Sequence, residues 1–298
     1  MKLFVFEYAS AGGEGGEPFR REGAIMLSSL LSDLAKLKRI EVTTILSKHL
    51  SYERFPSHRI ANPGNDFFET VEDEIKRCDA VWLIAPETDQ ILKNITVMAE
   101  RFGKKVVGSS SEAVELFGDK LKSSERFDGI VSVPRTIRYE GTLPFYPAVI
   151  KPRDGAGGES VFKVDHPDEL PHLHGSYIAQ PFVEGETLSA GAIASDADVK
   201  VIGVCRQQLD ISERLTLKAV SGPIEYPRMD ELSEMFGRIK NVSTGLLGYF
   251  GVDFIDNGKE IIIIEVNPRL TTSYPLYSKS AERNLGGEIL SACALEGF

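Results

Sequence analysis

The sequence of this chain is most informative between residues 253 and 269, which read DFIDNGKEIIIIEVNPR. Asn257-Gly258 is typical of a two-residue hairpin turn, so we expect two strands to fold back and bring Asp253 beside Glu265. Asn267 lies two residues beyond Glu265 and therefore points to the same face of the strand. Two carboxylates and an amide oxygen on one face suit Mg²⁺, which binds a few carboxylates together with substrate phosphates.

A solvated hairpin with scattered acidic residues is the alternative interpretation of this segment. Glu265 argues against it, because it interrupts the apolar run from Ile261 to Val266, where a buried charge needs a partner. Arg269 follows Pro268 and is placed to bind a phosphate or a carboxylate through two parallel hydrogen bonds. We therefore interpret the hairpin as a site for a metal ion and an anionic group.

A glycine-rich loop lies farther upstream. Lys151 ends the apolar segment 148–151, and Asp154-Gly155-Ala156-Gly157-Gly158 follows it before a strand returns at 160–164. Glycines let backbone N–H groups approach phosphate oxygens closely, and a lysine adds a positive charge. The loop is not a Walker A loop, because its lysine precedes the glycines. Taken alone it could equally be a flexible hairpin, and Lys120 could be an ordinary solvated lysine.

The segment 178–186 joins two groups of predicted strands. An extended apolar segment can offer backbone N–H and C=O groups to the edge of an adenine, and a carboxylate a few residues on can bind two ribose hydroxyls. In isolation, an ordinary connector is the better interpretation.

The first hundred residues alternate between strand and helix patterns. We predict strands at 2–6, 41–46, 80–84 and 105–107, and helices near 22–37, 66–77 and 88–102. This alternation indicates a small parallel sheet of the α/β class. Ligands of such sheets lie at the carboxyl ends of the strands, where the loops after Phe6 and Ile84 fall. From about residue 109 short strands dominate, so we expect a domain boundary there.

The composition disfavours several classes of partner. A formal charge of −10 over 298 residues disfavours nucleic acid. No apolar stretch approaches the ~20 residues of a membrane span, and the start shows no signal peptide. Three widely spaced cysteines make no CxxC pair, which fits a reducing cytoplasm. His172 and His174 lack a third ligand at a metal-binding spacing, and we interpret them as surface residues.

In their order along the chain these segments resemble the ATP-grasp superfamily of carboxylate–amine ligases. The order is Asp119-Lys120, Lys151 with its glycine loop, Gln180–Glu186, Asp253, and Glu265-Val266-Asn267-Pro268-Arg269. The resemblance covers about residues 109–298. It implies an ATP-grasp fold of the α/β class with an N-terminal parallel pre-ATP-grasp domain (1–108) and an ATP-grasp domain (109–298). The latter would divide into a lid subdomain (about 125–183) and a C-terminal subdomain (about 184–298).

The resemblance also implies which residues bind each ligand. ATP phosphates would be bound by Lys120, Lys151 and the loop glycines Gly155, Gly157 and Gly158. Adenine would be bound by Gln180 and the backbone of Phe182 and Val183, and the ribose by Glu186. Two Mg²⁺ (or Mn²⁺) ions would be bound by Asp253, Glu265 and Asn267. Gln180 departs from the glutamate of many members, although its amide can still accept from the amino group of adenine.

The resemblance implies a two-step reaction. A carboxylate would attack the γ-phosphate of ATP, with Arg269 and Lys151 as catalytic residues, and an amine would then attack the acyl phosphate. Amide, ADP and phosphate would be the products, and the lid hairpin around 154–159 would exclude water. The partners would be a small carboxylate and a small amine, and a homodimer is expected only by analogy with other members.

More narrowly, the chain is similar to archaeal tyramine–L-glutamate ligases of methanofuran biosynthesis. The similarity lies in Phe6–Gly13, Cys205–Gln208 and Glu265–Tyr274. It implies that the γ-carboxyl of glutamate is activated and joined to tyramine. Arg206 would bind the acceptor carboxylate or the phosphates, with a surface ion pair as an equally good alternative. The hydroxyls of Thr271, Thr272 and Ser273 would bind the activated substrate, with helix capping as the alternative.

The opening loop, FEYASAGGEGG at 6–16, lacks the GxGxxG spacing of a dinucleotide site. We expect Glu7, Tyr8 and Ser10 to position a substrate, with Glu7 binding the amine of tyramine or of glutamate. A surface loop without substrate contacts is the alternative. Two other functions stay open, namely an ATP-grasp ligase for another carboxylate and amine, and a non-catalytic nucleotide-binding regulator. The complete acidic hairpin disfavours the regulator.

Overall fold

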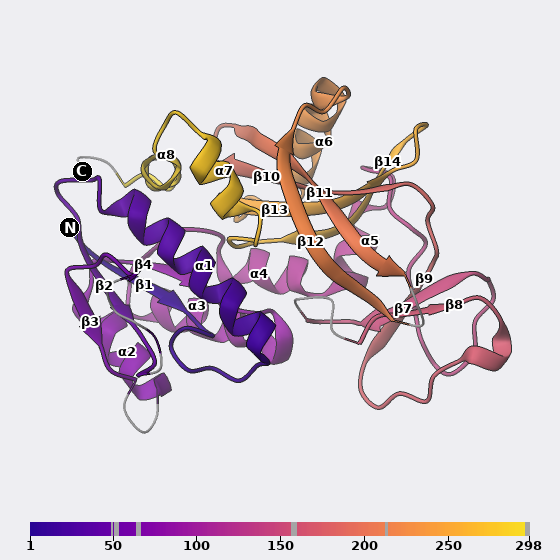
Figure 1. Ribbon diagram of the computed structural model, residues 1–298, viewed down its shortest axis with the longest axis horizontal. Helices are drawn as coiled ribbons and strands as arrows, with labels where there is room; N and C mark the ends of the chain where they lie inside the picture. Colours follow the sequence, from indigo (N-terminus) through magenta and orange to yellow (C-terminus); the bar gives the residue numbers. More distant parts are fainter. Residues whose placement is uncertain (49, 51–53, 64–66, 156–159, 212–213, 296–298) are drawn as a thin grey trace.

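The computed structural model describes residues 1–298 except 49, 51–53, 64–66, 156–159, 212–213 and 296–298. Three sheets form its framework (Figure 1). The predicted phosphate-binding residues Gly157 and Gly158 lie outside the described residues. Within the described residues, no helix combines the length and apolarity needed to cross a membrane.

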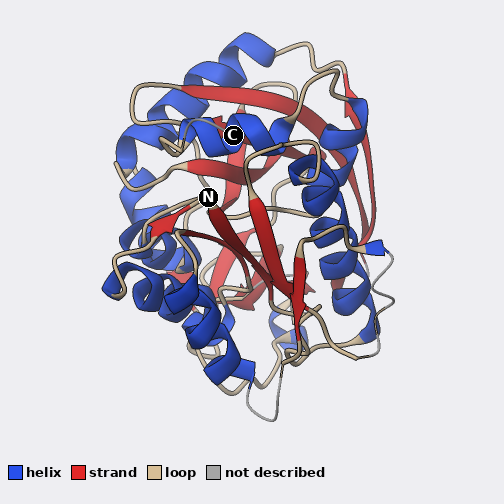
Figure 2. Ribbon diagram, turned by 90° about the vertical axis from the view of Figure 1, so that its left-hand side faces the viewer, coloured by secondary structure: helices blue, strands red, loops and turns tan. Residues whose placement is uncertain are grey.

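The first sheet is parallel, in the order β3-β2-β1-β4-β5. Its strands are β1 (Lys2–Glu7), β2 (Glu41–Ile45), β3 (Arg59–Ala61), β4 (Ala80–Ile84) and β5 (Lys105–Val106). The helices α1 (Glu17–Leu34), α2 (Phe67–Arg77) and α3 (Ile91–Arg101) lie on both sides of these strands (Figure 2), and the short 3₁₀ turn η2 (Thr88–Gln90) precedes α3. Every residue of β4 is buried, as expected for a parallel strand covered on both faces. The predicted parallel α/β sheet is confirmed.

The second sheet is antiparallel, in the order β12-β11-β10-β13-β14. Its strands are β10 (Glu186–Ala194), β11 (Val199–Ile211), β12 (Leu215–Ile224), β13 (Gly248–Asp256) and β14 (Ile261–Asn267). Helix α6 (Met229–Val242) packs on it, and the ring of Phe236 stacks on Phe250 with centroids 5.5 Å apart. Helix α4 (Ser111–Gly118) contacts both α3 and β14, so it connects the first sheet to the second.

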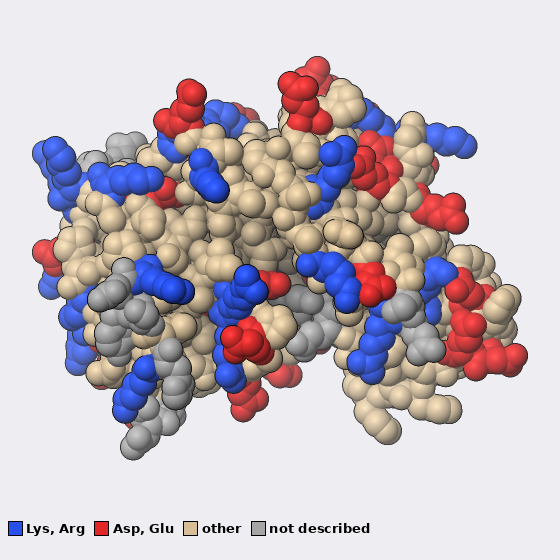
Figure 3. All heavy atoms as spheres, viewed as in Figure 1, with Lys and Arg blue, Asp and Glu red and all other residues tan. Residues whose placement is uncertain are grey.

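The third sheet, β6-β9-β7-β8, lies at the end of the molecule opposite the first (Figure 1). Its strands are β6 (Ile137–Arg138), β7 (Ala148–Pro152), β8 (Phe162–Val164) and β9 (Tyr177–Pro181), and η3 (Pro167–Glu169) lies between β8 and β9. β7 and β8 form the antiparallel hairpin that the sequence predicts. On the face shown in Figure 3, basic and acidic side chains are interspersed, so this face has no broad basic area of the kind that binds nucleic acid.

The turn of the acidic hairpin differs from the prediction. Asp256 pairs with Ile261, so four residues rather than two connect β13 to β14. The side chain of Asn257 accepts hydrogen bonds from the backbone N–H groups of Lys259 and Glu260, each at 2.9 Å, and the connection closes as a longer loop.

A β-bulge between Asp253 and Phe254 then shifts the register, and Glu265 pairs with Asp253. Without the bulge Ile264 would stand opposite Asp253, and the two carboxylates would lie on opposite faces of the sheet. The predicted proximity of Asp253 and Glu265 is therefore correct, but the bulge produces it and not the turn.

The last two helices return to the first sheet. α7 (Tyr274–Ser280) and α8 (Leu285–Ala292) pack against α1 (Figure 1). The buried carboxylate of Asp33, on α1, accepts hydrogen bonds from Tyr274 Oη and Ser278 Oγ, each at 2.8 Å. Asn284 Nδ2 donates to the backbone carbonyl of Asp33, also at 2.8 Å. Asp33 therefore fixes the C-terminal helices to the first sheet.

We expect Asp33→Ala to lower the free energy of unfolding by about 2–4 kcal/mol, because it leaves the buried hydroxyl of Tyr274 without an acceptor. Urea unfolding measures this change. Lys36→Ala is the matched control, since it removes only the exposed ion-pair partner of Asp33 and should cost less than about 0.5 kcal/mol. Equal effects of the two substitutions would contradict the role given to Asp33.

Candidate active site

Two lysines and two carboxylates meet where the second and third sheets face each other. Lys120 begins helix α5 (Lys120–Phe127), and its Nζ lies 3.0 Å from Glu265 Oε1. The same Nζ donates to the backbone carbonyl of Gly155 at 2.9 Å. Lys151, on β7, is 6% exposed, and Asp253 pairs with Glu265 across β13 and β14. We call these four residues the charge cluster.

Asp119 positions Lys120 in this cluster. Its carboxylate caps α5 by accepting from the N–H groups of Leu121 and Lys122, each at 3.1 Å. It also binds Arg153 through two bonds, Nε–Oδ1 at 2.8 Å and Nη2–Oδ2 at 2.6 Å. The backbone N–H of Lys120 donates to the Arg153 carbonyl at 3.0 Å. Our sequence analysis missed Arg153, although its place two residues after Lys151 and before the glycines was a usable signal.

The charge cluster perturbs the pKa of three members. Burial would raise the pKa of Glu265, but Lys120 and Lys151 hold it below the ordinary range. Burial lowers the pKa of Lys151 to about 8, although Glu265 opposes this shift. Burial and the charge of Glu265 raise the pKa of Asp253 to about 6. Repulsion between the two carboxylates is therefore only partly offset by the lysines.

The acidic hairpin fits a hard divalent cation. Asp253 accepts from Gln207 Nε2 at 2.9 Å and from Asn267 Nδ2 at 3.2 Å, and these bonds orient its carboxylate. The oxygens of Asp253, Glu265 and Asn267 are the ligand type that Mg²⁺ and Mn²⁺ prefer. A cation would also remove the repulsion that raises the pKa of Asp253. In the part of the chain that the structure describes, no three His, Cys, Asp or Glu side chains form a metal-binding group, and metal binding by the hairpin stays a prediction.

The predicted adenine and ribose residues lie along β9 and the start of β10. Gln180 is 5% exposed, and its Nε2 donates to Thr136 Oγ1 at 2.8 Å. The backbone N–H of Phe182 already donates to the Pro147 carbonyl at 2.9 Å, and contact of its carbonyl and of the Val183 backbone with adenine stays a prediction. Glu186 Oε1 accepts from Arg206 Nε at 2.5 Å. The two predicted ligand-binding side chains, Glu186 and Arg206, thus pair with each other at the surface.

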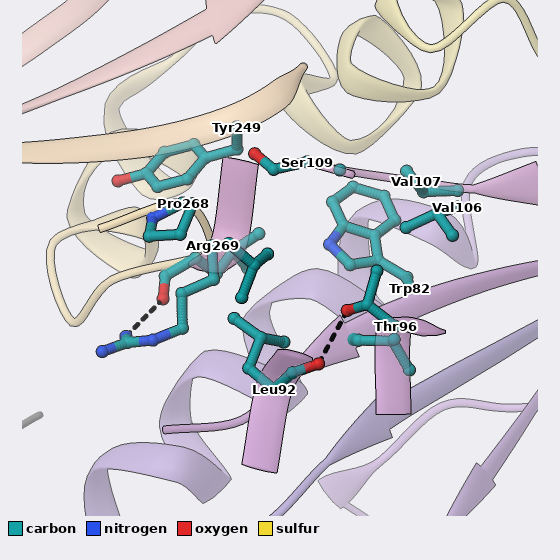
Figure 4. Close-up of a pocket in the computed structure, with 13 residues that line it drawn as sticks. Trp82, Leu92, Thr96, Val106, Val107, Ser109, Tyr249, Pro268 and Arg269 are labelled. Atoms are coloured by element: carbon teal, nitrogen blue, oxygen red, sulfur yellow. Dashed lines mark hydrogen bonds between the residues drawn. The ribbon is translucent and has the colours of Figure 1, made fainter. Parts of the chain in front are cut away.

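Arg269 follows the acidic hairpin and lies against the first sheet. Its Nη1 donates to the Leu270 carbonyl at 3.0 Å, and its Nη2 donates to Glu87 Oε2 at 2.8 Å. Figure 4 shows Pro268 and Arg269 beside Trp82 and Tyr249, around a cavity of about 10 Å³. This cavity holds about one water molecule, so it is too small for a substrate. Glu87 was not among the predicted site residues, although the loop after Ile84 was expected at the ligand-binding edge.

The opening loop is buried from Glu7 to Ala11, so the alternative of a surface loop is wrong for these residues. The carboxylate of Glu7 accepts from the N–H groups of Ala9 at 3.1 Å and Ser10 at 2.6 Å, and burial raises its pKa. Gly23 on α1 makes room for it, since a Cβ there would lie 2.5 Å from Glu7 Oε2. The ring of Tyr8 packs edge-on against Phe19 and Phe67.

Ser10 completes this loop. Its backbone carbonyl accepts from the N–H of Ser47 at 2.7 Å, and its buried hydroxyl lies near the Glu7 carboxylate, where it opposes the rise in the pKa of Glu7 that burial causes. The three residues predicted to bind substrate here thus already contact neighbouring protein groups. Their role in substrate binding stays a prediction.

Of the three predicted hydroxyl residues after Arg269, Thr271 and Ser273 are buried and Thr272 is partly exposed. Thr271 Oγ1 lies 2.8 Å from Tyr249 Oη, and Ser273 Oγ lies 3.5 Å from Ser189 Oγ. Ser273 precedes α7 but makes no side-chain capping bond, so the capping alternative is wrong for Ser273. Contact of either hydroxyl with substrate stays a prediction.

We expect Asp253→Asn to stabilise the ligand-free protein while removing its response to Mg²⁺. Because the folded-state pKa of Asp253 is raised, its charged form costs stability above pH 6, and this cost disappears as the pH falls toward 4. The variant should therefore unfold about 2–4 °C higher at pH 7.5, on the order of 1 kcal/mol, with a smaller difference near pH 4. Thermal melts with and without Mg²⁺ test this, and a lower Tm of the variant at pH 7.5 would contradict it.

Comparisons with known proteins agree with this geometry. A family model described as an ATP-grasp domain matches residues 117–273, and a model described as a pre ATP-grasp 3 domain matches residues 40–114. The tyramine–L-glutamate ligase of Methanocaldococcus fervens is 32% identical over 292 residues, which cover 95% of this chain and 91% of that protein. The tyramine–L-glutamate ligase of Methanocaldococcus jannaschii is 29% identical over 280 residues, covering 91% of this chain and 83% of that protein.

A solved structure is similar over almost the whole chain. It is the crystal structure of an ATP-grasp superfamily protein from Archaeoglobus fulgidus, with a TM-score of 0.79 and 27% identity, covering 98% of this chain and 88% of that one. ATP-grasp proteins use ATP with divalent metal ions. The chain belongs to the ATP-grasp family of carbon–nitrogen ligases, with a pre-ATP-grasp domain preceding the ATP-grasp domain.

Proposed function

We propose that the chain joins the γ-carboxyl group of L-glutamate to the amine of tyramine, at the step of methanofuran biosynthesis that forms this amide. The charge cluster is the observation that carries the activation step, because two buried lysines lie beside two carboxylates suited to a divalent ion. The choice of glutamate and tyramine is supported by the similarity to tyramine–L-glutamate ligases over 95% of the chain.

In the first step a γ-carboxylate oxygen of glutamate attacks the γ-phosphorus of ATP. The new O–P bond forms while the bond to the β–γ bridging oxygen breaks, so ADP leaves. Lys120 and Lys151 would bind the phosphates, and Arg269 would bind the transferring group, which offsets the charge that collects on its oxygens. A divalent ion bound by Asp253, Glu265 and Asn267 supplies further positive charge to the phosphates.

In the second step the amine forms a C–N bond to the acyl carbon and loses a proton, while the C–O bond to the phosphate breaks and inorganic phosphate leaves. Water must be kept from the acyl phosphate until the amine arrives. The start of the glycine loop contacts both helix α5 and the turn η2. The carbonyl of Gly155 accepts from Lys120 Nζ, and Asp154 Oδ2 accepts from the N–H of Asp89 at 3.3 Å. Residues 156–159 of this loop lie outside the described residues, and its role in excluding water stays a prediction.

The nucleotide base and ribose would lie along β9 and β10. Gln180 and the backbone at Phe182 and Val183 would contact adenine. Glu186 would bind the ribose hydroxyls after its ion pair with Arg206 opens, which would also release Arg206 for a phosphate or a substrate carboxylate. Both side chains are about half exposed, so this exchange costs little free energy.

Release of ADP tests the proposed function directly. The purified chain is mixed with ATP, Mg²⁺ and glutamate, and tyramine, phenethylamine or tyrosine is added as the amine. We expect ADP to form with tyramine, and the product to have the mass of glutamyl-tyramine. Turnover only with another carboxylate or amine would replace the substrate pair, and no ADP with any pair would refute the ligase mechanism.

The pKa of Lys151 predicts how ADP binding changes with pH. Because this pKa is about 8 in the ligand-free protein, Lys151 loses its charge as the pH rises through 8, while the phosphates of ADP stay fully ionised. The affinity for Mg-ADP should therefore fall about tenfold per pH unit well above pH 8. Lys151→Met should bind more weakly at pH 7 and lack this dependence, as calorimetry at pH 7–9.5 would show. The same slope in Lys151→Met would contradict the assignment.

A further inference from the structure

We propose that Glu87 is a positioning residue for phosphoryl transfer, which holds the guanidinium of Arg269 in place from the first sheet. The inference rests on the proposed function of Arg269 and extends it to a residue of the pre-ATP-grasp region.

The contact between Glu87 and Arg269 is short and almost solvent-free. Nη2 of Arg269 lies 2.8 Å from Glu87 Oε2, and the side chains are 11% and 4% exposed. The contact therefore uses one nitrogen of the guanidinium and one of the two carboxylate oxygens. Within the described residues, Arg269 Nε and Glu87 Oε1 are both buried and have no hydrogen-bond partner. Arginine–carboxylate contacts frequently have two parallel bonds, so this single-bonded pair retains one unused donor, Arg269 Nε, and one unused acceptor, Glu87 Oε1.

Glu87 is rigidly placed. It lies three residues beyond the end of β4, and its backbone carbonyl accepts from the N–H of Gln90 at 3.0 Å. Helix α4 ends against it, since a Cβ at Gly118 would lie 3.3 Å from Glu87 Cβ. Because Glu87 is held near the end of β4 and against the end of α4, its carboxylate determines the position of the Arg269 guanidinium.

Four further carboxylates lie near Arg269, and in the described part of the chain none of them is hydrogen-bonded to it. Asp253 and Glu265 on the hairpin, and Glu7 and Glu22 on the first-sheet side, all interact with its charge. A guanidinium released from Glu87 could pair with Glu265 or Asp253 and occupy the place of a metal ion. Glu87 would therefore keep Arg269 away from the metal ligands as well as orient it.

Aluminium fluoride bound beside Mg-ADP mimics the transferring phosphoryl group, so its effect on ADP affinity tests this role without an organic substrate. Mg-ADP is titrated by calorimetry into the protein with and without aluminium fluoride. For Glu87→Gln we expect Mg-ADP alone to bind within twofold of wild type, and the tightening caused by aluminium fluoride to fall at least tenfold. Asp89→Asn is the matched control, because it removes an exposed charge two residues away, at a positive φ that asparagine tolerates.

Turnover gives a second readout. With whichever carboxylate and amine support ADP release, Glu87→Gln should lower kcat at least tenfold and leave the KM for ATP within twofold. If Glu87→Gln fails to fold, Glu87→Asp replaces it, since it keeps the charge but withdraws the carboxylate by one methylene. An unchanged aluminium fluoride effect in the folded variant, or an equal loss in Asp89→Asn, would overturn the proposal. Failure of glutamate and tyramine alone would refute only the substrate pair.

Discussion

The charge cluster brings two positive and two negative side chains, Lys120, Lys151, Asp253 and Glu265, together in a largely buried place. The surrounding helices and strands hold these side chains in position. Buried charges are costly unless they are paired, so each of the four must arrive at the right position. The cap and ion pair of Asp119 place Lys120, strand β7 places Lys151, and the bulge in the hairpin places the carboxylates. The compensation is incomplete at Asp253, because burial and the charge of Glu265 raise its pKa. Additional positive charge at this position would stabilise its carboxylate.

The first sheet contributes to this site, although none of the residues proposed to bind ATP lies on it. Its C-terminal strand edge supplies Glu87 to Arg269, and helix α1 supplies Asp33 to the C-terminal helices. The residues proposed to bind ATP lie instead on α5, β7, β9 and the second sheet. This division suits a family that uses one ATP site with many substrates, because the loops of the first sheet can change while the charge cluster stays the same.

The sequence predicts the order of elements and the composition of the cluster well, because the Glu265 charge in an apolar strand and the lysine before a glycine loop are local patterns. It does not predict the bulge, since nothing in the run of four isoleucines shows which one is unpaired. Glu87 was missed because its partner, Arg269, lies 182 residues farther along the chain, and a pairing between two distant loop residues leaves no local periodicity. The buried positions of Glu7, Thr271 and Ser273 likewise depend on packing between distant segments.

Transfer of oxygen from the carboxylate to phosphate tests the central mechanism most directly. Glutamate labelled with ¹⁸O in its γ-carboxyl group is converted with ATP, Mg²⁺ and tyramine, and the released phosphate is analysed by mass spectrometry. If the carboxylate attacks the γ-phosphorus, each phosphate released with product carries one ¹⁸O atom. Amide formation with unlabelled phosphate would contradict the acyl-phosphate mechanism and the role of the charge cluster in it.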